Sequence, residues 1–314
     1  MEPHRSRAEA RYRDAERALW RSLGAEPAEH RIHLATIRST VRVQEVGQGD
    51  PIVFIHGAST SGTSWASLSA RLPDVRCLIV DRPGTGLSDP WVRPIRDAAS
   101  LKAVAREFLP DLLDALGLER VAVISTSFGG LFAFHGALAA PGRVSRIVEF
   151  GWSAGAPLPR MPLAMRLGAV PVLGALSTRL PVNERSVRAM FRAVGLREAI
   201  DAGLVSDEAI RAYAALLAHT DTLRNELRLA RGLVSPLRGV DPGVNLTEAE
   251  RAAITIPVRF IWGDRDVFGG IDVARPFVAS FPDSSLRIVP GAGHSPWMDA
   301  PDLAADLVRQ ALAD

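Results

Sequence analysis

The sequence lacks several features that would each indicate a particular class of protein. Cys77 is the only cysteine, so the chain can form no internal disulfide. Lys102 is the only lysine, the net charge is +2, and the arginines are interspersed with acidic residues. No basic stripe with interleaved aromatics is present, and no set of Cys, His, Asp and Glu has metal-ligand spacing. We therefore expect no nucleic-acid partner, no metal site and no cofactor.

Long apolar runs are also missing. The longest covers about residues 167–176, contains a proline, and is far shorter than the ~20 residues that a membrane-spanning helix needs. The first residues lack a hydrophobic signal core and are rich in Glu and Asp, unlike a secretion signal or a transit peptide. We expect a cytoplasmic protein without a membrane span. Cys77 lies in an apolar, strand-like run and is interpreted as a small core residue.

The 314 residues alternate between strand-like and helical patterns along most of the chain. This alternation predicts an α/β fold with a doubly wound, mostly parallel sheet. Residues 99–116 have helical periodicity, in which Pro110 predicts a kink or a break. Between residues 151 and 253 the strand-like runs give way to Leu-, Ala- and Arg-rich helical patterns. The expected domains are a helical extension (1–31), a core (32–150 and 254–314) and an inserted helical cap (151–253).

The N-terminal stretch, residues 1–23, predicts a mostly solvated helix with one apolar patch near its end. Three interpretations stay open at the level of sequence. The helix could pack on the body of the protein, cover the mouth of a site, or form a homo-oligomer.

Ser127 lies at a sharp predicted turn from a strand to a helix. An apolar, β-branched run stops at small residues, and a helical pattern follows Gly129 and Gly130. A serine at such a turn projects its hydroxyl above the sheet, and the N–H of the next residue, Phe128, points into the same space. Ser125 stands where a glycine is usual, so the pattern is Ser-x-Ser-x-Gly.

Two further candidates, Asp266 and His294, follow later predicted strands. The carboxyl ends of parallel strands meet at one edge of a sheet, where such folds bind ligands. The order Ser, Asp, His is the order expected when the serine lies on this kind of turn. A serine hydroxyl needs an imidazole to take its proton, and the imidazole needs a carboxylate to fix its tautomer. The backbone N–H groups of Phe128 and Ala58 are the candidate donors to an oxyanion.

Together these features resemble the α/β-hydrolase fold superfamily. The resemblance covers about residues 37–314 and rests on five segments in the same order: 56–57, 81–88, the turn at Ser127, 263–266, and 293–294 with the following 299–301. It implies that Ser127 is the nucleophile, Asp266 the acid and His294 the base. Because a serine occupies the turn, the branches of the superfamily that use an aspartate nucleophile are disfavoured.

We interpret the chain as a serine hydrolase that forms an acyl-enzyme. The Leu-, Ala- and Val-rich cap favours a small, largely apolar substrate with an ester-type bond (carboxylic ester, lactone or thioester). Trp152 and Trp297 are the expected substrate contacts. One alternative is hydrolysis of a carbon–carbon bond in a vinylogous diketone, although relatives with that activity typically have a tryptophan where this chain has Ser295. Acyl transfer to an acceptor other than water would use the same three residues, and a non-catalytic, ligand-binding member of the superfamily could carry them too.

Several polar residues near the candidate site have simpler interpretations. Asp264 competes with Asp266 for the role of the acid, but the family pattern favours Asp266. His56 is expected to shape the loop that carries Ala58. Glu149 lies inside an apolar strand, where a buried carboxylate requires a partner. The cap arginines, among them Arg188, are expected to be solvated charges on helix faces.

Overall fold

A computed structural model describes residues 2–159, 161, 166–167, 170, 176, 181–235, 237 and 239–314. Parts of the expected cap, including most of the apolar run at 167–176, lie outside these residues. None of the helices in the described ranges is long and apolar enough to cross a membrane.

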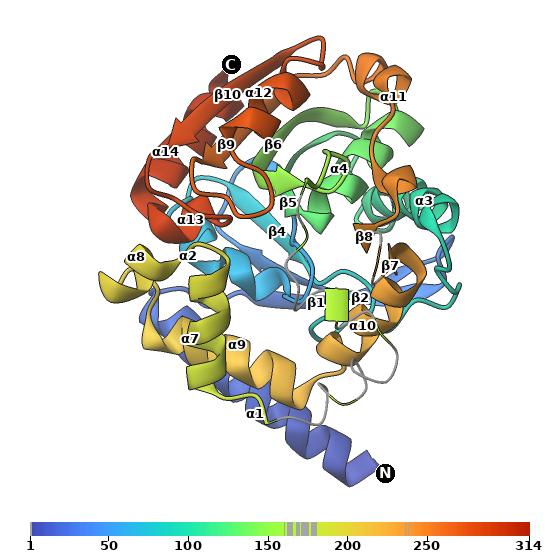
Figure 1. The fold of residues 1–314 in the computed structure, drawn as a ribbon. Helices are drawn as coiled ribbons and strands as arrows, with labels where there is room; N and C mark the ends of the chain where they lie inside the picture. Colours follow the sequence, from blue (N-terminus) through green and yellow to red (C-terminus); the bar gives the residue numbers. More distant parts are fainter. Residues whose placement is uncertain are drawn as a thin grey trace.

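An eight-stranded sheet forms the centre of the molecule, in the order β1-β2-β4-β3-β5-β6-β9-β10 (Figure 1). The pairs β1–β2 and β2–β4 are antiparallel, and every other pair in this sheet is parallel. This is the predicted doubly wound, mostly parallel sheet. The strands are β1 (Ala28–Leu34), β2 (Ser39–Val46), β3 (Pro51–Ile55), β4 (Arg76–Val80), β5 (Val121–Ser127), β6 (Val144–Ser153), β9 (Val258–Gly263) and β10 (Ser284–Val289).

The sheet has a hydrophobic core on each face, because successive side chains of a strand point to opposite sides. In β3, Val53 and Ile55 belong to one core and Ile52 and Phe54 to the other. The first core is covered by α3 (Ala98–Ala115), α4 (Phe128–Ala139) and α12 (Ile271–Val278). The second is covered by α2 (Ala66–Ser69), α13 (Pro296–Asp299) and α14 (Pro301–Ala313), together with the end of α1 (Glu2–Ser22). Cys77 is buried in the second core, which raises the pKa of its thiol to about 12.

Helix α3 continues through Pro110, where the sequence predicted a kink or a break. Leu109, Leu112 and Leu113 beside this proline are fully buried. They lie in the same core as α4, which packs against α3. We attribute the unbroken helix to this packing, which offsets the backbone hydrogen bond that a proline cannot make.

The first residues of the expected cap, 151–153, still belong to β6 of the central sheet. The regular structure in the rest of its described residues is helical apart from a small two-stranded sheet. They form α7 (Glu184–Ala193), α8 (Arg197–Asp201), α9 (Asp207–His219), α10 (Thr222–Leu233), β7 (Val234–Ser235), β8 (Gly239–Val240), the 3-10 helix η2 (Pro242–Val244) and α11 (Glu248–Ala253). Helices α7, α8 and α9 share an apolar cluster of their own, which includes Val187, Phe191 and Ile210.

The N-terminal helix packs on the body of the protein. Figure 1 shows α1 running along α9 of the cap, and the two helices are in extensive contact. Leu19 and Trp20 near the end of α1 reach the second core. Strand β1 begins at Ala28, so the last residues of the expected 1–31 extension already belong to the sheet.

Candidate active site

Ser127 ends β5 and immediately precedes α4. Its φ of 54° and ψ of −124° are uncommon for a residue with a side chain, so the turn holds Ser127 in a strained conformation. The turn is also tightly packed. A Cβ at Gly129 would lie 2.3 Å from the Ile55 carbonyl oxygen, and one at Gly130 would lie 2.0 Å from Ser153 Oγ. Only glycine fits at positions 129 and 130, which explains the small residues that follow Ser127.

His294 and Asp266 are hydrogen-bonded to each other. His294 Nδ1 lies 2.9 Å from Asp266 Oδ2, and the aspartate side chain is fully buried. Asp266 also accepts hydrogen bonds from the backbone N–H groups of Trp152, at 2.6 Å, and Phe268, at 3.0 Å. An ionised carboxylate is an acceptor only, so it fixes the proton on His294 Nδ1 and leaves Nε2 free to accept a proton.

The backbone around Ser127, Asp266 and His294 is closely interlocked. Gly151, with φ of 64°, lies against both partners of the pair: a Cβ there would be 2.5 Å from the His294 carbonyl oxygen and 3.0 Å from Asp266 Oδ2. Gly57 lies against the serine, since a Cβ there would be 3.0 Å from Ser127 Cβ. Ser127 is the last residue of β5, Asp266 follows β9 and His294 follows β10, so all three stand at the carboxyl edge of the parallel part of the sheet.

A buried arginine, Arg82, holds the loop that carries Ala58 in place. Arg82 donates from Nε to the His56 carbonyl oxygen, at 3.0 Å, and from one Nη to the Gly57 carbonyl oxygen, at 2.9 Å. His56 Nε2 accepts the Arg82 backbone N–H at 3.0 Å, so Nδ1 carries the proton and donates to the Gly57 carbonyl oxygen at 2.7 Å. Burial, followed by the nearby Arg82 charge, holds the pKa of His56 well below its usual value. His56 therefore shapes this loop as a neutral residue, as its position in the sequence suggested.

The cap also contacts this loop. Glu226 on α10 pairs with Arg82 at 3.1 Å and accepts the Ser59 backbone N–H at 3.2 Å. Tyr213 on α9 donates its hydroxyl to the Ser59 carbonyl oxygen at 2.6 Å. Ser59 has φ of 56°, so both partners hold a strained residue directly after Ala58. No sequence pattern pointed to Glu226 or Tyr213, because both lie on cap helices far from any recognisable motif.

Two backbone N–H groups flank the serine. Phe128 is the first residue of α4, where a helix leaves N–H groups without partners. Ala58 follows Gly57, whose Cα lies against Ser127. Within the described residues, neither of these N–H groups donates a hydrogen bond to another protein atom. Both are therefore available to a ligand. The Arg82 guanidinium lies 4.8 Å from the centre of the Phe128 ring, which links the two donors through one buried side chain.

A buried acid lies directly beneath this turn. Glu149 on β6 is paired in register with Ser125 on β5, and the Ser125 hydroxyl donates to Glu149 Oε2. The other carboxyl oxygen of Glu149, Oε1, makes no well-directed hydrogen bond. This oxygen lies close to the backbone of α4, since a Cβ at Gly130 would be 2.5 Å from it. Burial raises the pKa of Glu149 to about 8, while hydrogen bonds from Ser125, Ser153 and the Ser127 backbone oppose this shift. Ser125, the departure from the usual glycine, is thus the partner that the carboxyl group requires.

The two tryptophans expected to contact substrate have different surroundings. Trp152 is next to the His–Asp pair, where its N–H holds Asp266 and its ring packs on Phe268 at 5.8 Å between centroids. Trp297 is 3% exposed, its ring packs against Trp65 at 4.3 Å between centroids, and its indole N–H donates to the Ser64 carbonyl oxygen. We therefore assign Trp297 to the core. The position of Trp297 three residues after His294 did not predict its surroundings, because its side chain points into the second core.

The other charged candidates have local partners. Asp264 Oδ1 accepts the Gly291 N–H at 2.7 Å, so it stabilises a turn. Arg188 pairs with Asp207 at 2.6 Å and Arg192 with Asp201 at 2.9 Å, all on the cap. Across the part of the chain that the structure describes, no group of three or more His, Cys, Asp and Glu side chains could hold a metal ion.

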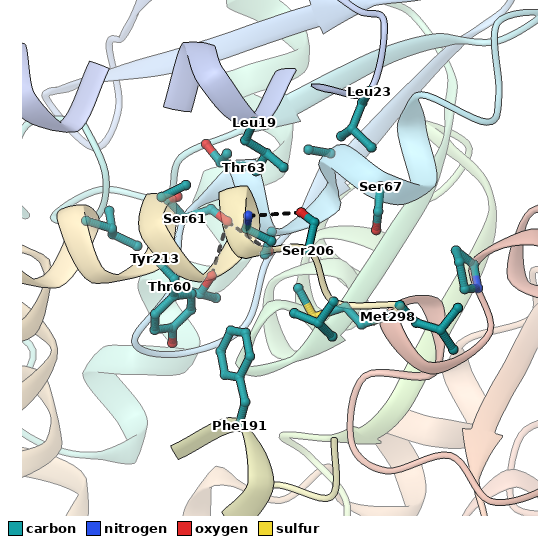
Figure 2. Close-up of a pocket in the computed structure, with 18 of the residues that line it drawn as sticks. Leu19, Leu23, Thr60, Ser61, Thr63, Ser67, Phe191, Ser206, Tyr213 and Met298 are labelled. Atoms are coloured by element: carbon teal, nitrogen blue, oxygen red, sulfur yellow. Dashed lines mark hydrogen bonds between the residues drawn. The ribbon is translucent and has the colours of Figure 1, made fainter. Parts of the chain in front are cut away.

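A cavity of about 110 Å³ is lined in part by residues of the segment 60–67 (Figure 2). Leu19 and Leu23 of α1 line one side, and Phe191 and Tyr213 of the cap line another. Hydroxyl groups of the loop, such as that of Ser61, line the remaining wall. Ser127, Asp266 and His294 do not line this cavity.

The chain is similar to known proteins in both sequence and fold. Residues 52–307 match the model of the alpha/beta hydrolase family. The chain is 31% identical to a 2-hydroxy-6-oxononadienedioate/2-hydroxy-6-oxononatrienedioate hydrolase from Cupriavidus pinatubonensis. The alignment spans 261 residues and covers 81% of this chain and 84% of that protein. The crystal structure of naproxen esterase from Bacillus subtilis is similar with a TM-score of 0.74 and 20% identity, over 96% of this chain and 97% of that one. The structure of 2-hydroxy-6-oxo-6-phenylhexa-2,4-dienoate hydrolase from a Rhodococcus strain is similar with a TM-score of 0.74 and 16% identity, over 92% and 99% of the two chains.

Proposed function

Because the chain belongs to the alpha/beta hydrolase family, we propose that this enzyme is a serine hydrolase with Ser127 as its nucleophile. His294 is the general base and Asp266 fixes the tautomer of His294. The observation that carries the proposal is the hydrogen-bonded His294–Asp266 pair at the sheet edge where the strained turn presents Ser127. Residues 151–253 act as the cap over this edge.

The chemistry follows from these positions. Ser127 Oγ attacks the substrate carbonyl carbon while its proton passes to His294 Nε2. The carbonyl oxygen becomes an oxyanion that accepts hydrogen bonds from the N–H groups of Ala58 and Phe128. Collapse of this intermediate breaks the bond to the leaving group, which takes the proton from His294, and leaves an acyl group on Ser127. Water then attacks the acyl carbon while His294 takes its proton. The bond between this carbon and Ser127 Oγ breaks, the serine oxygen takes the proton back from His294, and the acid is released.

We propose an ester-type bond of a largely apolar small molecule as the substrate. The apolar rings of Trp152 and Phe268 lie beside the His–Asp pair, and Phe268 contacts the His294 ring at 4.4 Å between centroids. Arg188 and Arg192 of the cap are held in ion pairs with cap carboxylates, so their charges are already compensated. These features favour an uncharged substrate.

A second candidate is hydrolysis of a carbon–carbon bond in a vinylogous diketone, through the same three residues. The names of two relatives favour it. The protein from Cupriavidus pinatubonensis is named as a 2-hydroxy-6-oxononadienedioate/2-hydroxy-6-oxononatrienedioate hydrolase, and one from Burkholderia cepacia, 26% identical over 271 residues, as a 2-hydroxy-6-oxo-6-phenylhexa-2,4-dienoate hydrolase. Such substrates carry a carboxylate, which requires a cationic partner in the site.

One experiment separates the two candidates. Purified enzyme is assayed with p-nitrophenyl esters of increasing acyl length and with 2-hydroxy-6-oxo-6-phenylhexa-2,4-dienoate, alongside Ser127→Ala. We expect kcat/KM to be highest for an ester and to be lost in the variant. A kcat/KM for the dienoate well above that of every ester would instead establish the carbon–carbon hydrolase. Activity that survives in Ser127→Ala would contradict both.

A further inference from the structure

The N-terminal helix carries polar side chains that are buried deep in the molecule. Tyr12 and Glu16 on α1 are 1% and 3% exposed, although the sequence of this helix is mainly polar. Helix α1 also precedes residues 52–307, the part of the chain that matches the family model. A helix that only covered the surface would not bury a carboxylate, because an unpaired buried charge is strongly unfavourable.

Glu16 is paired with a fully buried arginine of the sheet. Two nitrogens of Arg42 on β2 donate to its two carboxylate oxygens, at 2.7 Å and 2.8 Å. Burial alone would raise the pKa of Glu16, but the Arg42 charge and the hydrogen bonds from Arg42, Thr63 and Tyr12 hold the pKa below its usual value. The helix is thus attached to the sheet through an ionised, bidentate pair, which is strongly directional.

The same residues contact the loop that follows Ala58. Thr63 donates its hydroxyl to Glu16 Oε1, and Tyr12 donates its own to the same oxygen at 2.8 Å. Ser61 Oγ lies 3.1 Å from the Tyr12 hydroxyl oxygen. Because the Tyr12 proton is used on Glu16, Ser61 is the donor in that contact.

Asp81, at the end of β4, completes the network. Its Oδ2 accepts from Arg42 Nε at 2.7 Å, and its Oδ1 accepts the Gly62 backbone N–H at 2.8 Å. Three consecutive loop residues, 61 to 63, are therefore fixed by α1 and Asp81. Ser59 is fixed by the cap and Gly57 by Arg82, so the residues directly before and after Ala58 are held as well.

From this geometry we propose that Tyr12 and Glu16 of α1 are positioning residues for the reaction. They hold Ser61 and Thr63 and, through this loop, the Ala58 N–H of the proposed oxyanion hole. This inference rests on the proposed serine hydrolase activity. The rate of acyl transfer is sensitive to the position of oxyanion donors, and a displacement of about 1 Å can lower the rate ~100-fold.

The test uses the full chain with Tyr12→Phe and Glu16→Gln. Tyr12→Phe keeps the buried ring and removes only the hydroxyl, and Glu16→Gln keeps the shape and removes the charge. The matched control is Trp20→Phe on the same helix, since Trp20 is buried and its indole N–H has no hydrogen-bond partner in the described structure. For each protein, kcat and KM for p-nitrophenyl acetate, inhibition by an aryl trifluoromethyl ketone, and Tm are measured.

We expect Tyr12→Phe to lower kcat roughly tenfold with KM little changed, and to weaken the trifluoromethyl ketone by a similar factor, because that inhibitor forms an oxyanion. Glu16→Gln should act in the same direction. Trp20→Phe should lower Tm and leave kcat unchanged. If Tyr12→Phe folds and keeps full kcat, or if Trp20→Phe lowers kcat as much, the inference is wrong while the proposed function stands. A wild-type enzyme that neither turns over the ester nor binds the ketone would overturn both.

Discussion

Glu149 makes the stability of this enzyme depend on pH in an unusual direction. The pKa of Glu149 is raised from 4.5 to about 8 in the folded protein, chiefly by burial. Between these two values the folded state holds a proton that the unfolded state has released, so stability falls as pH rises through this window. Below pH 4.5 both states are protonated and the group has no effect. Above pH 8 both are ionised and the destabilisation is complete.

The magnitude follows from the shift. At 1.36 kcal/mol per pKa unit, the full effect of Glu149 is roughly 5 kcal/mol, of which roughly 4 kcal/mol develops between pH 5 and pH 9. Glu149→Gln removes it, because an amide does not ionise. The glutamine offers one acceptor to the Ser125 hydroxyl and one donor toward Ser153, as the protonated acid does.

The assay is urea unfolding of wild type and Glu149→Gln at pH 5 and pH 9. The variant should be close to wild type at pH 5 and more stable by several kcal/mol at pH 9. Ser125→Gly is the control in the opposite sense, because it removes a hydrogen bond that favours the ionised form of Glu149. This change should raise the pKa of Glu149 in the folded protein further, so that the loss of stability extends to higher pH. A difference between wild type and Glu149→Gln that is the same at both pH values would refute the reasoning.

Three other variants probe the site. Asp266→Asn should lower kcat about 10⁴-fold with the fold intact, because Asn stabilises the wrong tautomer of His294; a loss of less than tenfold would argue against the role of Asp266. Gly57→Ala places a Cβ 3.0 Å from Ser127 Cβ and should lower kcat at least ~10-fold with little change in Tm. An unchanged kcat would show that the close contact between Gly57 and Ser127 does not matter for the reaction. Glu226→Gln leaves the fully buried Arg82 without its ion pair and should lower the free energy of unfolding by about 3 kcal/mol in urea titrations; no loss would mean that the pair adds nothing.

The positions of Ser127, Asp266 and His294 could be predicted because each follows a strand that the apolar pattern marks clearly. Once the strands are parallel, their carboxyl ends must meet at one edge. The structural role of His56 in the loop at 56–58 could be anticipated as well, because this loop follows β3. Glu149 was visible as an anomaly, a carboxylate inside an apolar strand, and Ser125 as a departure from glycine. Their pairing depends on the register between β5 and β6, which single-strand patterns do not contain.

The contacts between distant segments could not be predicted. Tyr12 and Glu16 belong to a helix whose pattern is mainly polar, and only the docking of α1 shows that they meet Arg42. Glu226 and Tyr213 of the cap reach Ser59 through tertiary packing alone. Trp297 was expected to contact substrate, but its side chain lies in the second core, and a sequence does not determine which way a side chain points.

The most direct test of the central claim is covalent labelling of the full chain with a fluorophosphonate, followed by mass spectrometry of the peptides. We predict modification at Ser127 in wild type, and none in Ser127→Ala or His294→Ala, since the hydroxyl needs the imidazole to become a nucleophile. Wild-type enzyme that stays unlabelled, or that is labelled at another serine, would contradict the assignment of Ser127 as the nucleophile.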